Sequence, residues 1–161
     1  MSSKRTPTKT NAMRILDKEQ IRYEVSEHEL KDAFISGSEQ ARMYGQDPDQ
    51  VFKTLVLYAK NEEYYVCVIP VDATLDLKKA EETFGVKRLK MLPMKELQGV
   101  SGYVHGGCSP VGMKRLYPTA IDETAQLFDT IFVSGGKIGL QICLDPEDLL
   151  RATKADYADL T

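Results

Sequence analysis

The sequence of 161 residues predicts a single α+β domain. Six or seven short segments have the alternating or β-branched composition of strands, and several are separated by turns of hairpin length. Helical periods are inserted between some of these segments, without the regular strand–helix–strand alternation of a doubly wound sheet. We therefore expect a mixed, mostly antiparallel sheet of six or seven strands, surrounded by helices and able to close like a barrel.

The expected helices are recognised by their apolar period and by capping residues. Asp76 as N-cap and Gly85 as the stop delimit a helix over 77–84. Pro146 after Asp145 begins a C-terminal helix, because proline is well suited to the first helical position. The other expected helical segments are 8–18 and 38–44, with single turns near Pro48, at 93–97 and at 123–127.

The expected strands are 21–25, 53–58, 64–69, 88–92, 119–122, 130–133 and 138–144. Asn61, Glu62 and Glu63 form the turn of a hairpin between the second and the third of them. The strand 130–133 is expected to stop at the corner Ser134-Gly135-Gly136. Residues 1–7 are expected to form a flexible tail, and 26–34 is an acidic segment without a clean period.

Composition narrows the class of protein. A net charge of −3 argues against a wide basic nucleic-acid surface, so any nucleic-acid contact should be local. The polar N-terminus and the short apolar runs predict a cytoplasmic protein without a membrane partner. Three widely spaced cysteines, in no ligand-like spacing, predict neither a disulfide framework nor a metal site. No cofactor motif is found.

The stretch Gly102–Lys114, which we call the glycine loop, is the main candidate for a ligand site. It holds four glycines, Ser109 and Pro110 within thirteen residues. Glycine lets the backbone approach a ligand closely, and successive small residues can direct several N–H groups at one anionic oxygen. The loop lacks the Walker and dinucleotide-binding patterns. An isolated Gly-Gly pair would favour a surface turn, whereas the composition of the whole stretch indicates a ligand loop, with phosphate as one candidate ligand.

Other residues are weaker candidates for chemistry. Lys53 borders a strongly apolar segment, where it is either a solvent-facing strand residue or a point charge for a phosphate. His105 and Cys108 invite a Cys–His nucleophile reading, but no orienting carboxylate or amide is evident. His28, in the acidic segment, is interpreted as a solvated histidine. Together with the two glycine-rich corners, Lys53 predicts a pocket for an anion and a carbonyl group, on the evidence of the residues alone.

Three ordered motifs resemble the YbaK/EbsC family of aminoacyl-tRNA deacylases, which is related to the editing domain of bacterial prolyl-tRNA synthetases. The motifs are Phe52-Lys53-Thr54-Leu55-Val56, Gly106-Gly107-Cys108-Ser109-Pro110-Val111-Gly112 and Val133-Ser134-Gly135-Gly136-Lys137. The resemblance implies a barrel-like, largely antiparallel sheet. It also implies removal of a wrongly attached amino acid, typically cysteine, from tRNA(Pro), with prolyl-tRNA synthetase as a candidate partner.

The resemblance also implies roles for individual residues. Lys53 would hold a phosphate near the terminal adenosine, and the Gly106 and Gly107 backbone would face the ester carbonyl. The implied substrate-binding residues are Tyr23, Thr54, Ser109, Pro110, Ser134 and Gly135.

In this family the thiol of the substrate is thought to attack the ester, which would explain why the sequence shows no catalytic triad. Gln141 stands where close relatives often carry an acidic residue, so alanine, serine and proline stay open beside cysteine as the amino acid removed. Two other hypotheses stay open: a tRNA- or nucleotide-binding module without catalysis, and a hydrolase that uses Cys108.

Overall fold

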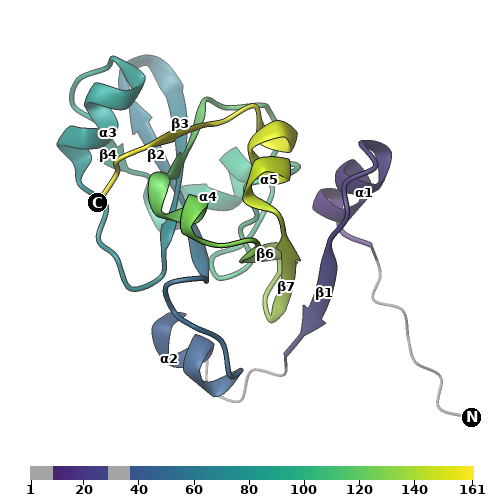
Figure 1. Cartoon of the computed structure of the whole chain (residues 1–161). Coiled ribbons are helices and arrows are strands. Elements are labelled where there is room, and N and C mark those ends of the chain that lie inside the picture. Colours follow the sequence, from purple (N-terminus) through teal and green to yellow (C-terminus); the bar gives the residue numbers. More distant parts are fainter. Residues whose placement is uncertain (1–8, 29–36) are drawn as a thin grey trace, which may run out of the picture.

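The computed structural model describes residues 9–28 and 37–161. The tail expected over 1–7 and most of the acidic segment 26–34 lie outside these ranges. Within the described residues the chain forms five α-helices and eight strands in two sheets, which confirms the α+β class. Figure 1 shows the helix α1 beside the smaller sheet at one side of the molecule and α3 beside the larger sheet at the other.

The smaller sheet has three antiparallel strands in the order β1-β7-β6. These strands are β1 (Glu24–Glu27), β7 (Leu140–Leu144) and β6 (Ile131–Lys137). The larger sheet has the order β4-β2-β3-β5-β8 and is mixed, because β5 pairs in parallel with both of its neighbours. Its strands are β4 (Lys90–Met91), β2 (Phe52–Ala59), β3 (Glu63–Pro70), β5 (Thr119–Asp122) and β8 (Asp156–Ala158).

The two sheets meet where β2 and β6 begin. Val51 and Phe132 form an isolated parallel bridge, and the Phe132 N–H donates to the Gln50 carbonyl over 3.1 Å. The described strands nevertheless form two open sheets, so the closed barrel expected from the sequence is not found. The bridge sets β2 and β6 side by side, with their side chains in a common register.

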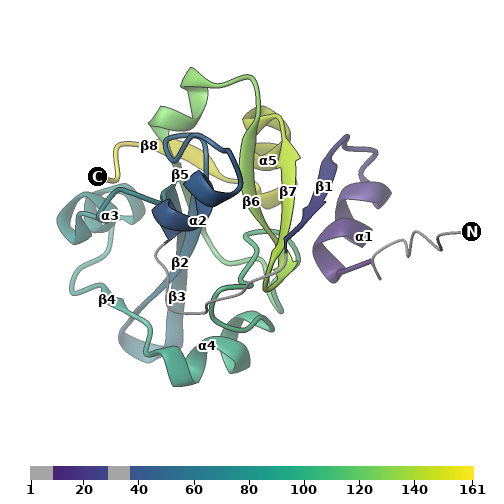
Figure 2. The same cartoon turned by 90° about the horizontal axis from the view of Figure 1, so that it is seen from below.

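The helices cover both sheets and their junction. They are α1 (Asn11–Lys18), α2 (Gly37–Met43), α3 (Leu77–Phe84), α4 (Met94–Ser101) and α5 (Pro146–Thr153), with 3-10 turns η1 (Lys60–Glu62) and η2 (Glu123–Leu127). Figure 2, seen from below, shows α2 in front of the region where β2 and β6 meet. None of the helices within 9–28 and 37–161 has the length and apolar character needed to cross a bilayer.

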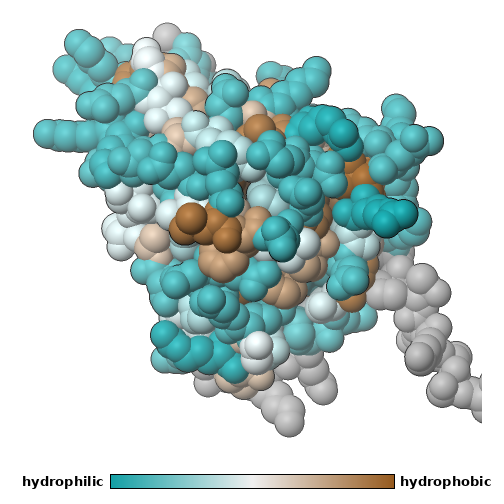
Figure 3. All heavy atoms as spheres, in the orientation of Figure 1, coloured by the Kyte–Doolittle hydropathy of each residue, from teal (hydrophilic) through white to brown (hydrophobic). Residues whose placement is uncertain are grey.

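The hairpin of β2 and β3 is the centre of the core because both of its faces are buried. Phe52, Val66 and Val68 pack against the smaller sheet and α1, whereas alternate residues such as Leu57 and Ile69 pack against α3. Each fully buried side chain of this size contributes about 1.5–3 kcal/mol. The outer surface is largely hydrophilic, with an apolar patch near the middle of the face in Figure 3.

Several sequence predictions need correction. β6 does not stop at Ser134-Gly135-Gly136 but continues to Lys137 through a register shift. The strand predicted over 21–25 lies further along the chain, because β1 spans Glu24–Glu27. The predicted single turn at 93–97 is a longer helix, α4. An eighth strand, β8, was not predicted.

Candidate functional site

The glycine loop folds back on itself before it reaches β6. Gly106 has a φ of 83°, a left-handed conformation that favours glycine. The Gly107 N–H donates to the Val104 carbonyl over 3.0 Å and closes the turn. Within the described residues the Gly106 N–H donates no hydrogen bond, so of these two amides it is the one free to bind a ligand.

Gly107 brings the glycine loop into direct backbone contact with the β6–β7 hairpin. A Cβ atom at this position would lie 2.8 Å from the Ile138 nitrogen and 2.9 Å from the Lys137 carbonyl carbon. Both neighbours are backbone atoms, so no side-chain rotation would relieve the clash. The absence of a side chain at Gly107 is therefore what allows the first glycine motif to lie against the end of the second.

Part of the glycine content serves packing against α1 rather than ligand binding. The Thr10 hydroxyl donates to the Gly135 carbonyl over 2.6 Å, and the Asn11 amide donates to the Gly112 carbonyl over 2.7 Å. A Cβ atom at Gly112 would lie 2.9 Å from the Tyr103 hydroxyl, which itself donates to the Val111 carbonyl. α1 thus fixes both glycine motifs, a role that periodicity alone could not reveal.

Lys53 and Ser134 share one face of the joined sheets. Each lies two residues beyond the bridge between Val51 and Phe132, and side chains alternate along a strand, so both project to the same side. The ammonium group of Lys53 forms no ion pair with a described residue. Burial lowers the pKa of Lys53, and the Asp72 carboxylate opposes part of this shift. A partly desolvated ammonium group gains from an anionic partner.

Gln141 lies directly across from Ser134 in the pairing of β6 and β7. Its side-chain oxygen accepts hydrogen bonds from Gln46 and from His28. His28 is therefore a partner of the sheet and stacks on Tyr44, so its interpretation as a solvated histidine was wrong. Sequence reasoning missed Tyr44 and Gln46 altogether, because nothing in their local pattern indicates a contact with a strand so far along the chain.

The other predicted substrate-binding residues lie apart from this face. Tyr23 packs on the core, and its hydroxyl donates to the Asp17 carboxylate over 2.9 Å. Burial, and to a smaller extent this hydrogen bond, raises the pKa of the Tyr23 hydroxyl to about 12. Ser109 and Pro110 are buried within the glycine loop, where the Ser109 hydroxyl accepts from the Val111 N–H. The Thr54 hydroxyl is buried and has no hydrogen-bond partner among the described residues.

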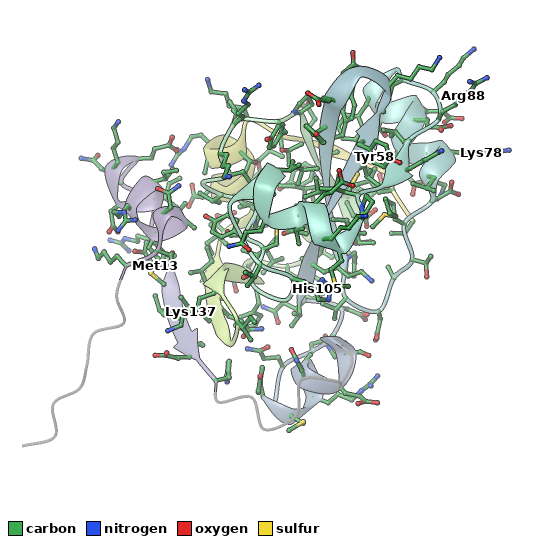
Figure 4. The ribbon with its side chains drawn as sticks, turned by 180° about the vertical axis from the view of Figure 1, so that it is seen from behind. Met13, Tyr58, Lys78, Arg88, His105 and Lys137 are labelled. Carbon is green, nitrogen blue, oxygen red and sulfur yellow. The ribbon has the colours of Figure 1, made fainter. Side chains whose placement is uncertain are left out.

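Cys108 and His105 do not form a nucleophile pair. Cys108 packs with Val56 and Tyr103 in a small buried cluster, and burial raises the pKa of its thiol to about 11. The thiolate is the nucleophilic form, so this position is unfavourable for attack at neutral pH. His105 is exposed, and Figure 4 shows it at the same end of the molecule as Lys137, far from Lys78 and Arg88.

One surface hollow of the described residues lies elsewhere. It has a volume of about 520 Å³ and is lined by residues from the start of β3, from α4 and from 114–118. Its lining mixes Lys114 and Arg115 with Glu62 and Glu63, which gives no preference for one charge. The described part of the chain contains no group of three or more His, Cys, Asp or Glu side chains placed to hold a metal ion. The face of Lys53 and Ser134 remains the candidate site.

Comparisons with known proteins identify the family. Residues 35–152 match the model of the aminoacyl-tRNA editing domain. The chain is 40% identical to EbsC of Enterococcus faecalis, over its own full length and over 98% of that protein. EbsC is named for an inferred role as a Cys-tRNA(Pro)/Cys-tRNA(Cys) deacylase. A crystal structure described as an inferred trans-editing enzyme for prolyl-tRNA synthetase superposes with a TM-score of 0.80 at 25% identity, covering 96% of this chain and 98% of that one. A hypothetical protein of 21% identity shares the fold, with a TM-score of 0.84 over 94% of this chain and 99% of its own. The chain belongs to the family of aminoacyl-tRNA editing domains.

Proposed function

We propose that the protein is a trans-editing deacylase that removes cysteine from Cys-tRNA(Pro), and also from Cys-tRNA(Cys). The observation that carries this proposal is the direct backbone contact of the glycine loop with the β6–β7 hairpin, whose strand β6 bears Ser134 on the face that it shares with Lys53. Membership of the editing family and the 40% identity to the Enterococcus faecalis protein support the reaction class and the substrate.

Lys53 supplies the positive charge of the proposed site. Its ammonium group is partly desolvated and has no ion-pair partner among the described residues, so a phosphate of the tRNA end would restore a favourable charge interaction. A single local cation suits a protein whose net charge is −3, because binding then depends on few phosphates. Lys53 therefore positions the substrate rather than reacting with it.

The glycine loop supplies the donor for the ester carbonyl. The Gly106 N–H is the proposed oxyanion donor, because the Gly107 N–H is already bound to the Val104 carbonyl. Gly107 contributes the close approach to the hairpin. Ser134, whose hydroxyl accepts from the Gly136 N–H, is the proposed polar contact for the ester on the face shared with Lys53.

The thiol of the substrate is the proposed nucleophile, since the candidate site offers no activated side chain of its own. The protein then contributes proximity and stabilisation of the oxyanion. Prolyl-tRNA synthetase is the candidate partner that would deliver mischarged tRNA(Pro), and the reaction would take place in the cytoplasm, where tRNA is charged.

The test is deacylation of a panel of labelled aminoacyl-tRNAs. Cys-tRNA(Pro) should lose its amino acid well above the rate of spontaneous hydrolysis, and Ala-, Ser- and Pro-tRNA(Pro) more slowly. A faster reaction with the alanyl ester would show that the protein removes alanine rather than cysteine. Binding of the tRNA without hydrolysis of any ester, with and without prolyl-tRNA synthetase, would favour a binding module.

The variants Lys53→Ala and Cys108→Ala separate this mechanism from a cysteine hydrolase. Loss of a hydrogen bond to a charged group costs about 1.5–3 kcal/mol, so Lys53→Ala should lower kcat/KM about 10- to 100-fold. Cys108→Ala removes a buried thiol with a pKa of about 11 and should lower only thermal stability. Steady-state kinetics on Cys-tRNA(Pro) provide the measurement. An inactive Cys108→Ala enzyme beside an active Lys53→Ala enzyme would favour the cysteine hydrolase.

A further inference from the structure

Gln141 occupies the middle of the face that carries Ser134. In the register of the smaller sheet it lies between Ser26 of β1 and Ser134 of β6, so the three polar side chains share one surface. Its neighbours Leu140 and Ile142 point the other way and are buried in the core. Gln141 is therefore held rigidly by a paired central strand.

Two distant segments are tied to the Gln141 side-chain oxygen. Gln46 Nε2 donates to this oxygen over 2.7 Å, and His28 Nε2 lies 3.2 Å from it in the donor role that an amide oxygen requires. The donors are 95 and 113 residues away in sequence. A single atom thus joins the end of β1 and the end of α2 to β7.

The two residues bound to Gln141, together with the tyrosine that stacks on one of them, form a compact group that we call the cover: His28, Tyr44 and Gln46. The rings of His28 and Tyr44 stack with centroids 3.6 Å apart and planes 7° from parallel. The His28 N–H donates to the Gly139 carbonyl over 2.7 Å, and the Gln46 N–H donates to the Ala41 carbonyl over 2.8 Å. The backbone of the cover is therefore anchored at both ends, and Gln141 provides its side-chain link to β7.

The cover also holds hydrogen-bonding groups that the described residues leave unused. The Tyr44 hydroxyl and the Gln46 side-chain oxygen are buried and have no partner there. Such groups are few in folded proteins and need an explanation. Both can accept a hydrogen bond, so they suit a ligand group that carries N–H donors, such as the α-ammonium group of an amino acid.

We propose that Gln141 is a specificity-determining residue, which positions the cover of His28, Tyr44 and Gln46 over the Ser134 face and so sizes the pocket for the amino-acid part of an aminoacyl ester. This inference rests on the proposed function and names how the same site selects its substrate. A neutral amide accepts both hydrogen bonds without adding a charge to the face. Without them the His28 ring and the Gln46 side chain lose their side-chain ties to β7, and larger amino acids gain access.

The experiment measures binding, so that chemistry does not enter the comparison. The probes are short RNA mimics of the tRNA 3′ end, carrying cysteine or leucine through an amide that resists hydrolysis. The wild-type protein should bind the cysteinyl mimic more tightly than the leucyl one. Gln141→Leu should reduce this ratio of dissociation constants about tenfold. Gln141→Glu keeps an acceptor oxygen and should retain the ratio.

Matched variants keep the test informative if Gln141→Leu folds poorly. Gln46→Leu removes one of the two ties, leaves Gln141 in place and should reduce the ratio in the same direction. Cys143→Ala changes the neighbouring side chain on the same face of β7 and should leave the ratio at the wild-type value. Circular dichroism of each variant shows whether it is folded.

Deacylation of Cys-tRNA(Pro) by the wild-type protein is measured in parallel. A wild-type preference that depends on Gln141 supports the inference even where no deacylation is seen, a result that would refute only the proposed catalysis. The inference is overturned if the wild-type protein shows no preference for the cysteinyl mimic. It is also overturned if folded Gln141→Leu and Gln46→Leu keep the preference, or if Gln141→Glu and Cys143→Ala lose it equally.

Discussion

Replacing Gly107 by alanine should lower the rate of Cys-tRNA(Pro) deacylation about a hundredfold, the cost of a misplacement of about 1 Å near the reacting groups. The added Cβ atom would lie 2.8 Å from the Ile138 nitrogen and 2.9 Å from the Lys137 carbonyl carbon. Because both are backbone atoms of the β6–β7 hairpin, either the glycine loop or the hairpin must move. The Gly106 N–H would then move relative to Ser134. Single-turnover rates with saturating enzyme measure the effect on chemistry.

Gly99→Ala is the matched control for this substitution. Gly99 lies in α4, a Cβ atom there would meet nothing within 4 Å, and alanine favours a helix by up to about 1 kcal/mol over glycine. Its deacylation rate should equal that of the wild-type protein, and its melting temperature should be equal or higher. Wild-type activity in Gly107→Ala would show that the contact between loop and hairpin is not needed for catalysis.

The parts of the fold that the sequence predicted correctly are specified by short-range signals. α3 begins and ends as predicted, because the Asp76 carboxylate accepts from the Lys78 and Lys79 N–H groups and Gly85 adopts the left-handed conformation that ends a helix. The hairpin of β2 and β3 was equally clear from its apolar strands and polar turn. Both signals act within a few residues of the element that they define.

The parts that the sequence did not predict depend on partners far along the chain. The Ser134-Gly135-Gly136 segment has the composition of a turn, yet β6 continues through it. Thr10 donates to the Gly135 carbonyl, and β7 pairs on both sides of the register shift. β8 is short, and among the described strands it pairs only with β5. No local pattern carries information of this kind.

The candidate site likewise combines residues that the sequence marks locally with contacts between distant segments that it does not. The glycine loop and Lys53 stand out in the sequence, and the family resemblance linked them with Ser134. Their common surface depends on the bridge between Val51 and Phe132, which brings β2 beside β6. The cover over Gln141 was missed because its contacts span about a hundred residues, as the 95 between Gln46 and Gln141 illustrate.

The proposed mechanism predicts that cysteinyl esters react much faster than seryl esters of the same tRNA. A thiol with a pKa near 8.5 is partly ionised at neutral pH and can attack without a protein base. A serine hydroxyl needs general-base help worth about 10²–10⁴-fold. His28, the histidine near this face, is already engaged by Gln141 and by stacking on Tyr44. Ser-tRNA(Pro) should therefore lag Cys-tRNA(Pro) by at least about a hundredfold, although serine is nearly the same size. Pre-steady-state rates of both esters provide the measurement.

The first product identifies the nucleophile. Attack of the substrate sulfur on its own carbonyl carbon forms a C–S bond, and the ester C–O bond then breaks, with the ribose hydroxyl as leaving group and proton acceptor. The amino acid should therefore leave as a thiolactone, which mass spectrometry or trapping with hydroxylamine detects before water opens the ring. Oxyanion stabilisation by the Gly106 N–H would act on the tetrahedral intermediate of this step. Equal rates for the two esters, with free amino acid as the first product, would instead indicate activated water, and the exposed His105 would become the first base to test.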